Sequence, residues 1–272
     1  MIHAARLIGP AVSGIVLEQL GASVCFLINA LSFLAVISSL FMMKLPVYKK
    51  PERVNNAFTD LKNGFTYLKN TPAISTVMLM LALVSLLSLP YITLLPVYAK
   101  EIFLGNASTF GFLNSFIGLG ALIGAFFLAS LKPGADLKKI LFTNTLIFGG
   151  GLMAVSYLTD LRLALPLMMM AGFGMMSQTT ISNTLIQTTV TPAMRGRVIS
   201  FYAMAFFGMQ PIGGLLVGAL SHAIGAPATF LIQGIVTVMI ALVFLPFLRG
   251  RRMKPTDKMK IEQLEERSVE TT

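Results

Sequence analysis

Eight apolar stretches, each about 20 residues long, limit what this chain can fold into. A helix of about 20 apolar residues crosses the roughly 30 Å hydrocarbon layer of a membrane. Apolar residues make up 55% of the sequence and charged ones only 12%, against about a quarter in soluble domains. We therefore expect an all-α integral membrane protein. The spans are placed at residues 2–20, 23–43, 73–97, 107–131, 139–158, 162–186, 198–221 and 226–248.

Lys and Arg lie almost entirely on one side of these spans. The segments near residue 1 and at 44–72, 132–139, 187–197 and 249–272 hold 19 of the 21 basic residues. Cytoplasmic loops carry such an excess, so these segments and the C-terminus are expected in the cytoplasm. The net charge of +10 does not indicate nucleic-acid binding, because the basic residues separate apolar runs instead of sharing a face with aromatic residues.

Residues that could carry catalysis or bind a metal are scarce. The chain has one cysteine, Cys25, and two histidines, His3 and His222, and no acid within a span lies near either histidine in sequence. We therefore expect no enzyme, no metal site and no cofactor. All eleven acids fall at span ends, in loops or in the tail, so none marks a proton-coupling site inside the membrane.

The string ARLIGPAVSG (residues 5–14) places a Gly-Pro pair inside the first apolar run. Such a pair removes a backbone donor and Cβ bulk, which kinks a helix and lets a neighbour approach closely. An ordinary proline kink is the alternative. With GASVCFLINALSF (21–33), the string resembles helices 5 and 6 of a major facilitator superfamily exporter, in the drug-antiporter branch of macrolide-efflux and enterobactin-exporter-type proteins. By this resemblance, the antiporter motif that shapes helix packing comprises Arg6, Gly9, Pro10, Ser13 (in place of a glycine) and Gly14.

An internal repeat adds to this architecture. Residues 225–234 align with residues 21–30 at five identities in ten, and Pro211 corresponds to Pro10. The resemblance implies a major facilitator fold with eight of its twelve helices, two from the N-terminal half and all six of the C-terminal half, and about 129 further residues upstream. The expected domains are residues 1–43 (last two helices of the first half), 44–72 (cytoplasmic connector), 73–248 (six-helix half) and 249–272 (charged, frayed or disordered tail).

The connector contains a helical pattern of its own. Phe58, Leu61, Phe65 and Leu68 recur at helical spacing, which predicts a short amphipathic helix at the membrane surface or a plain linker helix.

Polar residues on the spans that face the central cavity in this superfamily are the candidates for substrate contact. By the resemblance these are Ser85, Ser88, Tyr91, Asn114, Gln178, Asn183, Tyr202 and Gln210. Interhelical hydrogen bonding is the alternative for each of them. The methionines at 168–170 and 175–176 suit a deformable cavity, but we interpret them as lipid-facing packing.

Two arginines, Arg195 and Arg197, lie at a predicted helix start, where they oppose the helix dipole. They can act simply by keeping the loop in the cytoplasm. The string QTTVTP followed by RGR (187–197) is also similar to the helix 10 to 11 junction of the exporter branch, which implies a cytoplasmic gate at both arginines. The basic loop at 132–139 departs from the superfamily pattern at the equivalent place.

The resemblance implies a secondary exporter of the inner (plasma) membrane that moves amphiphilic or apolar small molecules, drug-like or siderophore-like. Alternating access and proton exchange are expected, so the partners are the lipid bilayer, the substrate and protons. The alternative is a truncated, non-transporting membrane fragment, or a partner subunit of a transporter. Four more apolar spans in the upstream reading frame would favour the exporter, and a stop codon there the fragment.

The charge asymmetry makes a prediction about topology. A topology reporter fused after Lys50 or at the C-terminus should indicate a cytoplasmic location, and one inserted at Gly105 should indicate the opposite side of the membrane. A cytoplasmic signal at Gly105 would refute the eight-span arrangement.

Overall fold

The computed structural model describes residues 2–43, 57–132 and 134–249, and every regular element in these ranges is a helix. The all-α prediction is thus confirmed. The longer helices are α1 (Ile2–Met42), α2 (Ala57–Asn70), α3 (Pro72–Leu87), α5 (Ala107–Ala129), α6 (Leu137–Val155), α7 (Leu161–Thr189), α9 (Met209–Ile224) and α10 (Ala226–Arg249). The shorter elements are the 3₁₀-helix η1 (Leu89–Leu94), α4 (Leu95–Val97), the π-helix η2 (Tyr98–Ile102), α8 (Arg195–Ala203) and the π-helix η3 (Met204–Gly208).

Two of the membrane spans are rods made of several helix types. α3, η1, α4 and η2 follow one another over Pro72–Ile102, and α8, η3 and α9 over Arg195–Ile224. Pro90 and Pro96 lack the N–H that an α-helix needs, so the first rod changes its hydrogen-bonding pattern near each of them. In the second rod the π turn lies just before Pro211. Such wide turns are often found at functional sites.

Short polar residues define where three of the spans begin. The Asn106 side chain accepts from the backbone N–H of Thr109 and forms a capping box at the start of α5. Asp136 caps α6, and Asp160 caps α7 by accepting from the N–H of Arg162 at 2.8 Å. These caps satisfy backbone donors that would otherwise be left without partners at the helix starts.

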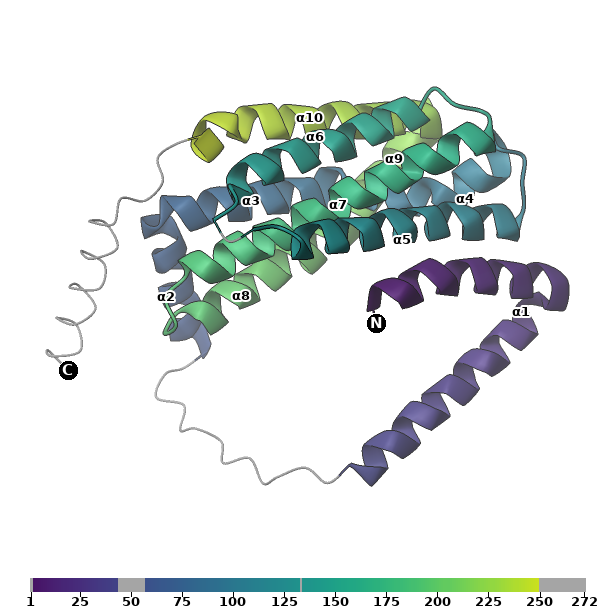
Figure 1. Ribbon diagram of the computed structural model, residues 1–272, viewed down its shortest axis with the longest axis horizontal. Coiled ribbons are helices and arrows are strands. Elements are labelled where there is room, and N and C mark those ends of the chain that lie inside the picture. Colours follow the sequence, from purple (N-terminus) through teal and green to yellow (C-terminus); the bar gives the residue numbers. More distant parts are fainter. Residues whose placement is uncertain (1, 44–56, 133, 250–272) are drawn as a thin grey trace, which may run out of the picture.

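The helices run side by side and their connections alternate between two ends of the bundle (Figure 1). One end carries α2, the turns that follow α5 and α7, and the end of α10. α5 lies between the first half of α1 and α7, whereas α6 and α10 pack against each other on the other side of α7. Six spans, from α3 to α10, therefore form one bundle with α1 beside it.

The sequence repeat is matched by the backbone of its two turns. Within α1 the helix breaks at Gly21, whose φ and ψ are 80° and 172°, and α9 ends at Gly225 with 85° and 158°. L residues rarely adopt such a conformation, so both turns favour glycine. After Gly21 the second half of α1 points away from the bundle and is not buried by it, whereas α10 packs on α6 and α3.

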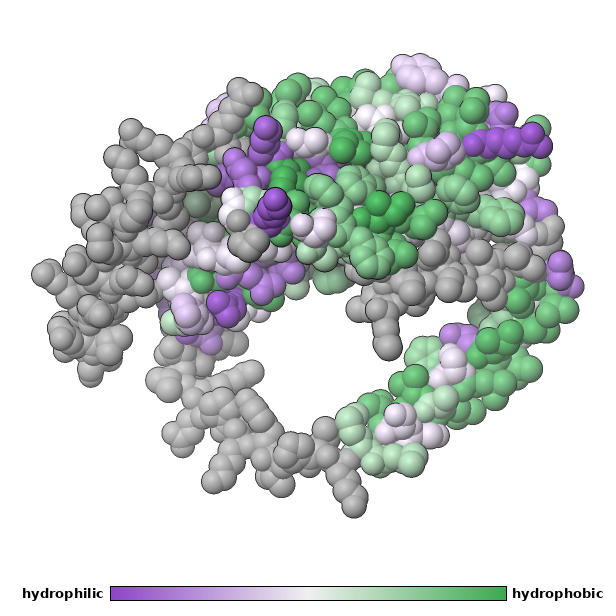
Figure 2. Space-filling view, in the orientation of Figure 1, coloured by the Kyte–Doolittle hydropathy of each residue, from purple (hydrophilic) through white to green (hydrophobic). Residues whose placement is uncertain are grey.

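Every predicted span coincides with a helix, but the spans differ in hydropathy. Length and composition qualify Ser23–Met42, Pro72–Ile102, Ala107–Ala129, Arg195–Ile224 and Ala226–Phe247 as able to cross a membrane. α6 and α7 fall short because they contain many polar residues, and their positions in the bundle place them beside the spans that qualify. Figure 2 shows a largely hydrophobic middle with hydrophilic residues gathered toward the two ends.

The connector helix is present as α2, and it contacts the bundle through a face that the apolar pattern did not predict. Leu68 and Gly64 are buried, whereas Leu61 and Phe65 are more than half exposed. The side chain of Phe58, residues 44–56 and the tail from residue 250 lie outside the described part of the chain. The outward pair gives α2 an apolar side that can lie on the membrane surface.

Glycines bring α5 and α7 into backbone contact. A Cβ built at Gly120 would overlap the carbonyl oxygen of Met169, and one built at Gly172 would overlap the carbonyl oxygen of Ile117. Small residues allow such approach in membranes, where association between helices depends on close packing and not on exclusion of water.

We therefore expect Gly120→Ala to lower the free energy of unfolding by about 1–3 kcal/mol, because the added methyl forces two backbones apart. Gly150→Ala is the matched control, since its Cβ would meet no atom within 4 Å. It should be neutral or stabilising by up to about 1 kcal/mol through helix propensity. Thermal unfolding of both variants in detergent measures the difference, and equal midpoints would show that the α5–α7 contact is not tight.

Candidate functional site

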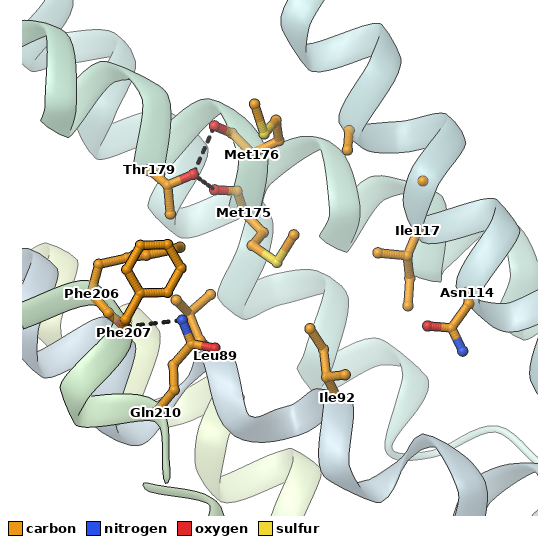
Figure 3. A pocket seen from close by; sticks show the side chains of 12 residues that line it. Leu89, Ile92, Asn114, Ile117, Met175, Met176, Thr179, Phe206, Phe207 and Gln210 are labelled. Atoms are coloured by element: carbon orange, nitrogen blue, oxygen red, sulfur yellow. Dashed lines mark hydrogen bonds between the residues drawn. The ribbon is translucent and has the colours of Figure 1, made fainter. Parts of the chain in front are cut away.

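A pocket of about 330 Å³ opens between four of the spans. It lies where η1, α5, α7 and the junction of η3 with α9 meet (Figure 3). Its lining residues are Leu89, Ile92, Asn114, Ile117, Gly118, Ala121, Met175, Met176, Thr179, Phe206, Phe207 and Gln210. These four spans are helices 7, 8, 10 and 11 in the resemblance, which are the C-terminal helices expected at the cavity.

Two amides provide the polar chemistry of the pocket. Asn114 donates its Nδ2 to the Phe110 carbonyl and Gln210 its Nε2 to the Phe206 carbonyl, each at 3.0 Å. Each amide donor therefore has a partner within its own span, and each side-chain carbonyl oxygen remains able to accept a hydrogen bond from an occupant. Among the residues that line the pocket none is charged, so its walls suit an apolar body with a few donor groups.

The hydroxyl of Thr179 is already engaged within α7. It donates to the backbone carbonyls of Met175 and Met176 at 3.0 and 3.1 Å (Figure 3), so it is not a free donor for an occupant of the pocket. Tyr202 borders the site from α8, because its ring stacks on Phe206 and its hydroxyl donates to the Thr179 carbonyl at 3.4 Å.

The other cavity candidates are not among the residues that line this pocket. Tyr91 is fully buried between the rings of Phe148 and Phe230, and its hydroxyl lies 3.7 Å from the sulfur of Met175. Ser88 accepts a hydrogen bond from Thr237 on α10 at 2.6 Å, as in the interhelical alternative.

Three further candidates also lie outside the pocket lining. Ser85 and Gln178 are fully buried, and the side-chain polar atoms of both have no hydrogen-bond partner among the described residues. Asn183 accepts from Gln187 one turn later on α7. The structure thus brings Asn114 and Gln210 together at the pocket, with Tyr202 beside it, and leaves five candidates within the bundle or on its surface.

Several pocket residues were not among the sequence candidates. Met175 and Met176 were interpreted as lipid-facing, but both line the pocket, so that interpretation is wrong for this pair. Phe206 and Phe207 were not identified from the sequence either. The signal that could have found them is their helical spacing to Gln210, as part of a mixed set of methionine, aromatic and amide residues.

The predicted antiporter motif lies in the first half of α1. The backbone remains helical through Gly9 and Pro10, and the break in α1 comes at Gly21. This half of α1 packs along α5, the helix that supplies one wall of the pocket. The side chains of Arg6 and Pro10 and the surroundings of Gly9 and Gly14 lie outside what the structure describes.

Arg197 is held by the connector helix. Its guanidinium donates to a carboxylate oxygen of Asp60 on α2 at 2.6 Å and contacts the sulfur of Met194. Because Asp60 brings a negative charge to the first turn of α8, it compensates the basic residues that oppose the dipole there. Arg195, by contrast, is exposed, and it forms no ion pair with the residues that the structure describes.

Two further contacts fix α2 to the same junction. The Tyr67 hydroxyl accepts from the backbone N–H of Thr191 at 3.3 Å, in the turn between α7 and α8. Gly64 faces Phe201 so closely that a Cβ there would lie 2.8 Å from the ring. α2 is therefore packed on α8 and on the turn before it at three points.

No three His, Cys, Asp or Glu side chains lie close enough to hold a metal ion together within the described ranges.

A family model described as transmembrane secretion effector, one of the major facilitator superfamily models, matches residues 1–272. The chain belongs to this family. The resemblance to major facilitator exporters is thereby confirmed, and the chain is a multi-pass membrane protein.

Relatives of this chain include transporters of different compounds. The staphyloferrin A transporter of Staphylococcus aureus is 26% identical over 93% of this chain and 63% of its own length. The multidrug efflux pump Tap of Mycolicibacterium fortuitum is 24% identical over 89% of this chain and 60% of its own. The enterobactin exporter EntS of Shigella flexneri is 25% identical over 93% and 61%. The chain thus spans about three fifths of the length of these relatives, which are transporters rather than enzymes.

The packing of α2 on α8 predicts how the connector responds to mutation. Asp60→Asn should speed hydrogen exchange in residues 57–70 by up to about fivefold, since a half-exposed ion pair contributes about 1 kcal/mol or less. The reversed pair Asp60→Arg with Arg197→Asp should restore part of the protection. Lys62→Gln, at an exposed position of the same helix, is the control. Equal exchange in all variants would mean that the ion pair does not hold α2.

Proposed function

We propose that this chain is the substrate-binding C-terminal part of a secondary exporter for amphiphilic or apolar small molecules. The observation that carries the proposal is the uncharged, methionine- and phenylalanine-lined pocket between α5, α7, η1 and η3. Its relatives include a multidrug efflux pump and an enterobactin exporter, which both move small molecules out of the cell. Two amide oxygens and a flexible apolar wall favour the drug-like side of this range over a polyanionic siderophore.

Transport by alternating access would use the same elements. In transporters built from repeats, one half rocks against the other around a central site. The proposed pocket would be this central site, and the π turn η3 in its wall would be a point where the helix can change shape. Proton exchange would drive export. Since no Asp or Glu lines the pocket, the proton-coupling group would lie outside it.

The proposed exporter also has a definite domain arrangement. We place residues 1–43 as helices 5 and 6, residues 44–72 as the connector, residues 73–248 as the second six-helix half and residues 249–272 as a tail. The protein would lie in the inner (plasma) membrane with its C-terminus in the cytoplasm. Arg197 with Asp60, and Arg195 beside them, would form the cytoplasmic gate. The alternative is a membrane fragment or partner subunit that binds ligand without transport.

Ligand binding by residues 1–272 tests the pocket directly. A cationic fluorescent amphiphile such as rhodamine 6G should bind the purified chain in detergent, measured by fluorescence anisotropy. Met176→Phe should weaken this binding about tenfold or more, because the ring occupies the pocket. Met170→Phe is the matched control, since Met170 is exposed on the same helix. Equal affinity in all three proteins would refute the pocket as the substrate site.

Cells separate the exporter from the alternative. Residues 1–272 expressed alone should leave rhodamine 6G accumulation at the level of vector controls, and the frame extended upstream by about 129 residues should lower it. Failure of the extended protein to export, with binding intact, would favour the fragment or partner. Energy-dependent efflux by the short chain alone would show that eight helices suffice or that two copies complete each other.

A further inference from the structure

A second cavity, of about 260 Å³, lies at the end of the bundle that carries α2. It is bounded by the end of α5, the loop before α6, the start of α6 and the last third of α7. Leu128, Leu137 and Ile181 form apolar walls, and Lys132, Thr180 and Thr184 form polar ones. This cavity shares no lining residue with the proposed substrate pocket.

Positive charge gathers at this cavity. Lys132 lines it, and Lys138 and Lys139 follow in the first turn of α6, whose N-terminus adds the positive end of its dipole. The acid in this segment, Asp136, accepts from the backbone N–H groups of Lys138 and Lys139 at 3.2 Å, so its carboxylate is engaged in capping α6. The loop therefore presents a net positive charge.

The polar and apolar walls are arranged as a membrane surface would require. The cavity lies where α5, a helix long and apolar enough to cross a membrane, ends and α6 begins, so in a membrane it would lie near the head groups. Thr184 donates its hydroxyl to the Thr180 carbonyl at 2.9 Å, whereas the Thr180 hydroxyl makes no hydrogen bond to the described residues. Phe126 and Phe127, which directly precede the cavity-lining Leu128 on α5, are exposed.

We propose that this cavity binds one anionic phospholipid. Lys132 and the Thr180 hydroxyl, which line the cavity, would bind the phosphate, and Lys139 in the adjacent first turn of α6 would add positive charge. Leu128, Leu137 and Ile181 would enclose the first carbons of a chain. The rest of the acyl chain would continue along the exposed phenylalanines of α5. A free phosphate would leave the apolar walls unused, and a zwitterionic lipid would gain little from the lysines, because basic clusters at the membrane surface select anionic head groups.

The purified chain of residues 1–272 in neutral detergent provides the test. Phosphatidylglycerol, added at increasing concentration, should raise the thermal unfolding midpoint and remain bound as a one-to-one adduct in native mass spectrometry. Phosphatidylcholine and inorganic phosphate should do neither. Lys132→Gln and Lys139→Gln should each weaken phosphatidylglycerol binding about fivefold, as expected for one charge near the surface.

Lys100→Gln is the control, because Lys100 is exposed at the opposite end of the bundle. Thr180→Leu, which fills the cavity without changing charge, should also weaken binding. Equal binding of phosphatidylcholine, equal stabilisation by inorganic phosphate, or an equal loss in Lys100→Gln would each overturn the proposal. Selective binding of phosphatidylglycerol that is lost in the lysine and Thr180 variants would establish it.

Discussion

Backbone contact between α5 and α7 is the interaction on which the rest of the bundle depends. Within a membrane, helices gain little by hiding apolar surface from one another, so they associate where small residues allow dense packing. Gly120 and Gly172 provide this on both helices, each against a carbonyl of the other. Because α5 and α7 also form two walls of the apolar pocket and two walls of the basic cavity, their spacing determines the width of both sites.

Polar groups within the spans are distributed between packing and binding. Thr237 and Ser88 join α10 to the start of η1, and Tyr91 lies among aromatic rings in the core. The side chains of Asn114 and Gln210 instead donate to backbone carbonyls of their own spans and leave an acceptor oxygen at the pocket. Whether a polar residue faces a neighbour or a cavity thus depends on rotation about the helix axis.

That rotation explains what the sequence could and could not predict. Hydropathy located the helices, because this signal acts over a short stretch of neighbouring residues. The cavity candidates were chosen by span and not by face, so they include both Asn114, which lines the pocket, and Ser85, which is buried in the bundle. The Asp60–Arg197 pair joins residues 137 positions apart, a distance at which no local pattern carries information.

Gly21 and Gly225 require glycine for a reason other than space. A Cβ at Gly21 would meet no atom within 4 Å, and one at Gly225 would meet only the ring of Pro227 at 3.9 Å. What excludes other residues is the sign of φ, which is 80° and 85°. D-alanine mirrors the preferences of L-alanine and would fit both turns, so these positions select handedness and not size. The turns at Gly21 and Gly225 therefore share a stereochemical requirement. The helices that follow them differ in direction because α10 packs on α6 and α3, whereas the second half of α1 is not buried by the bundle.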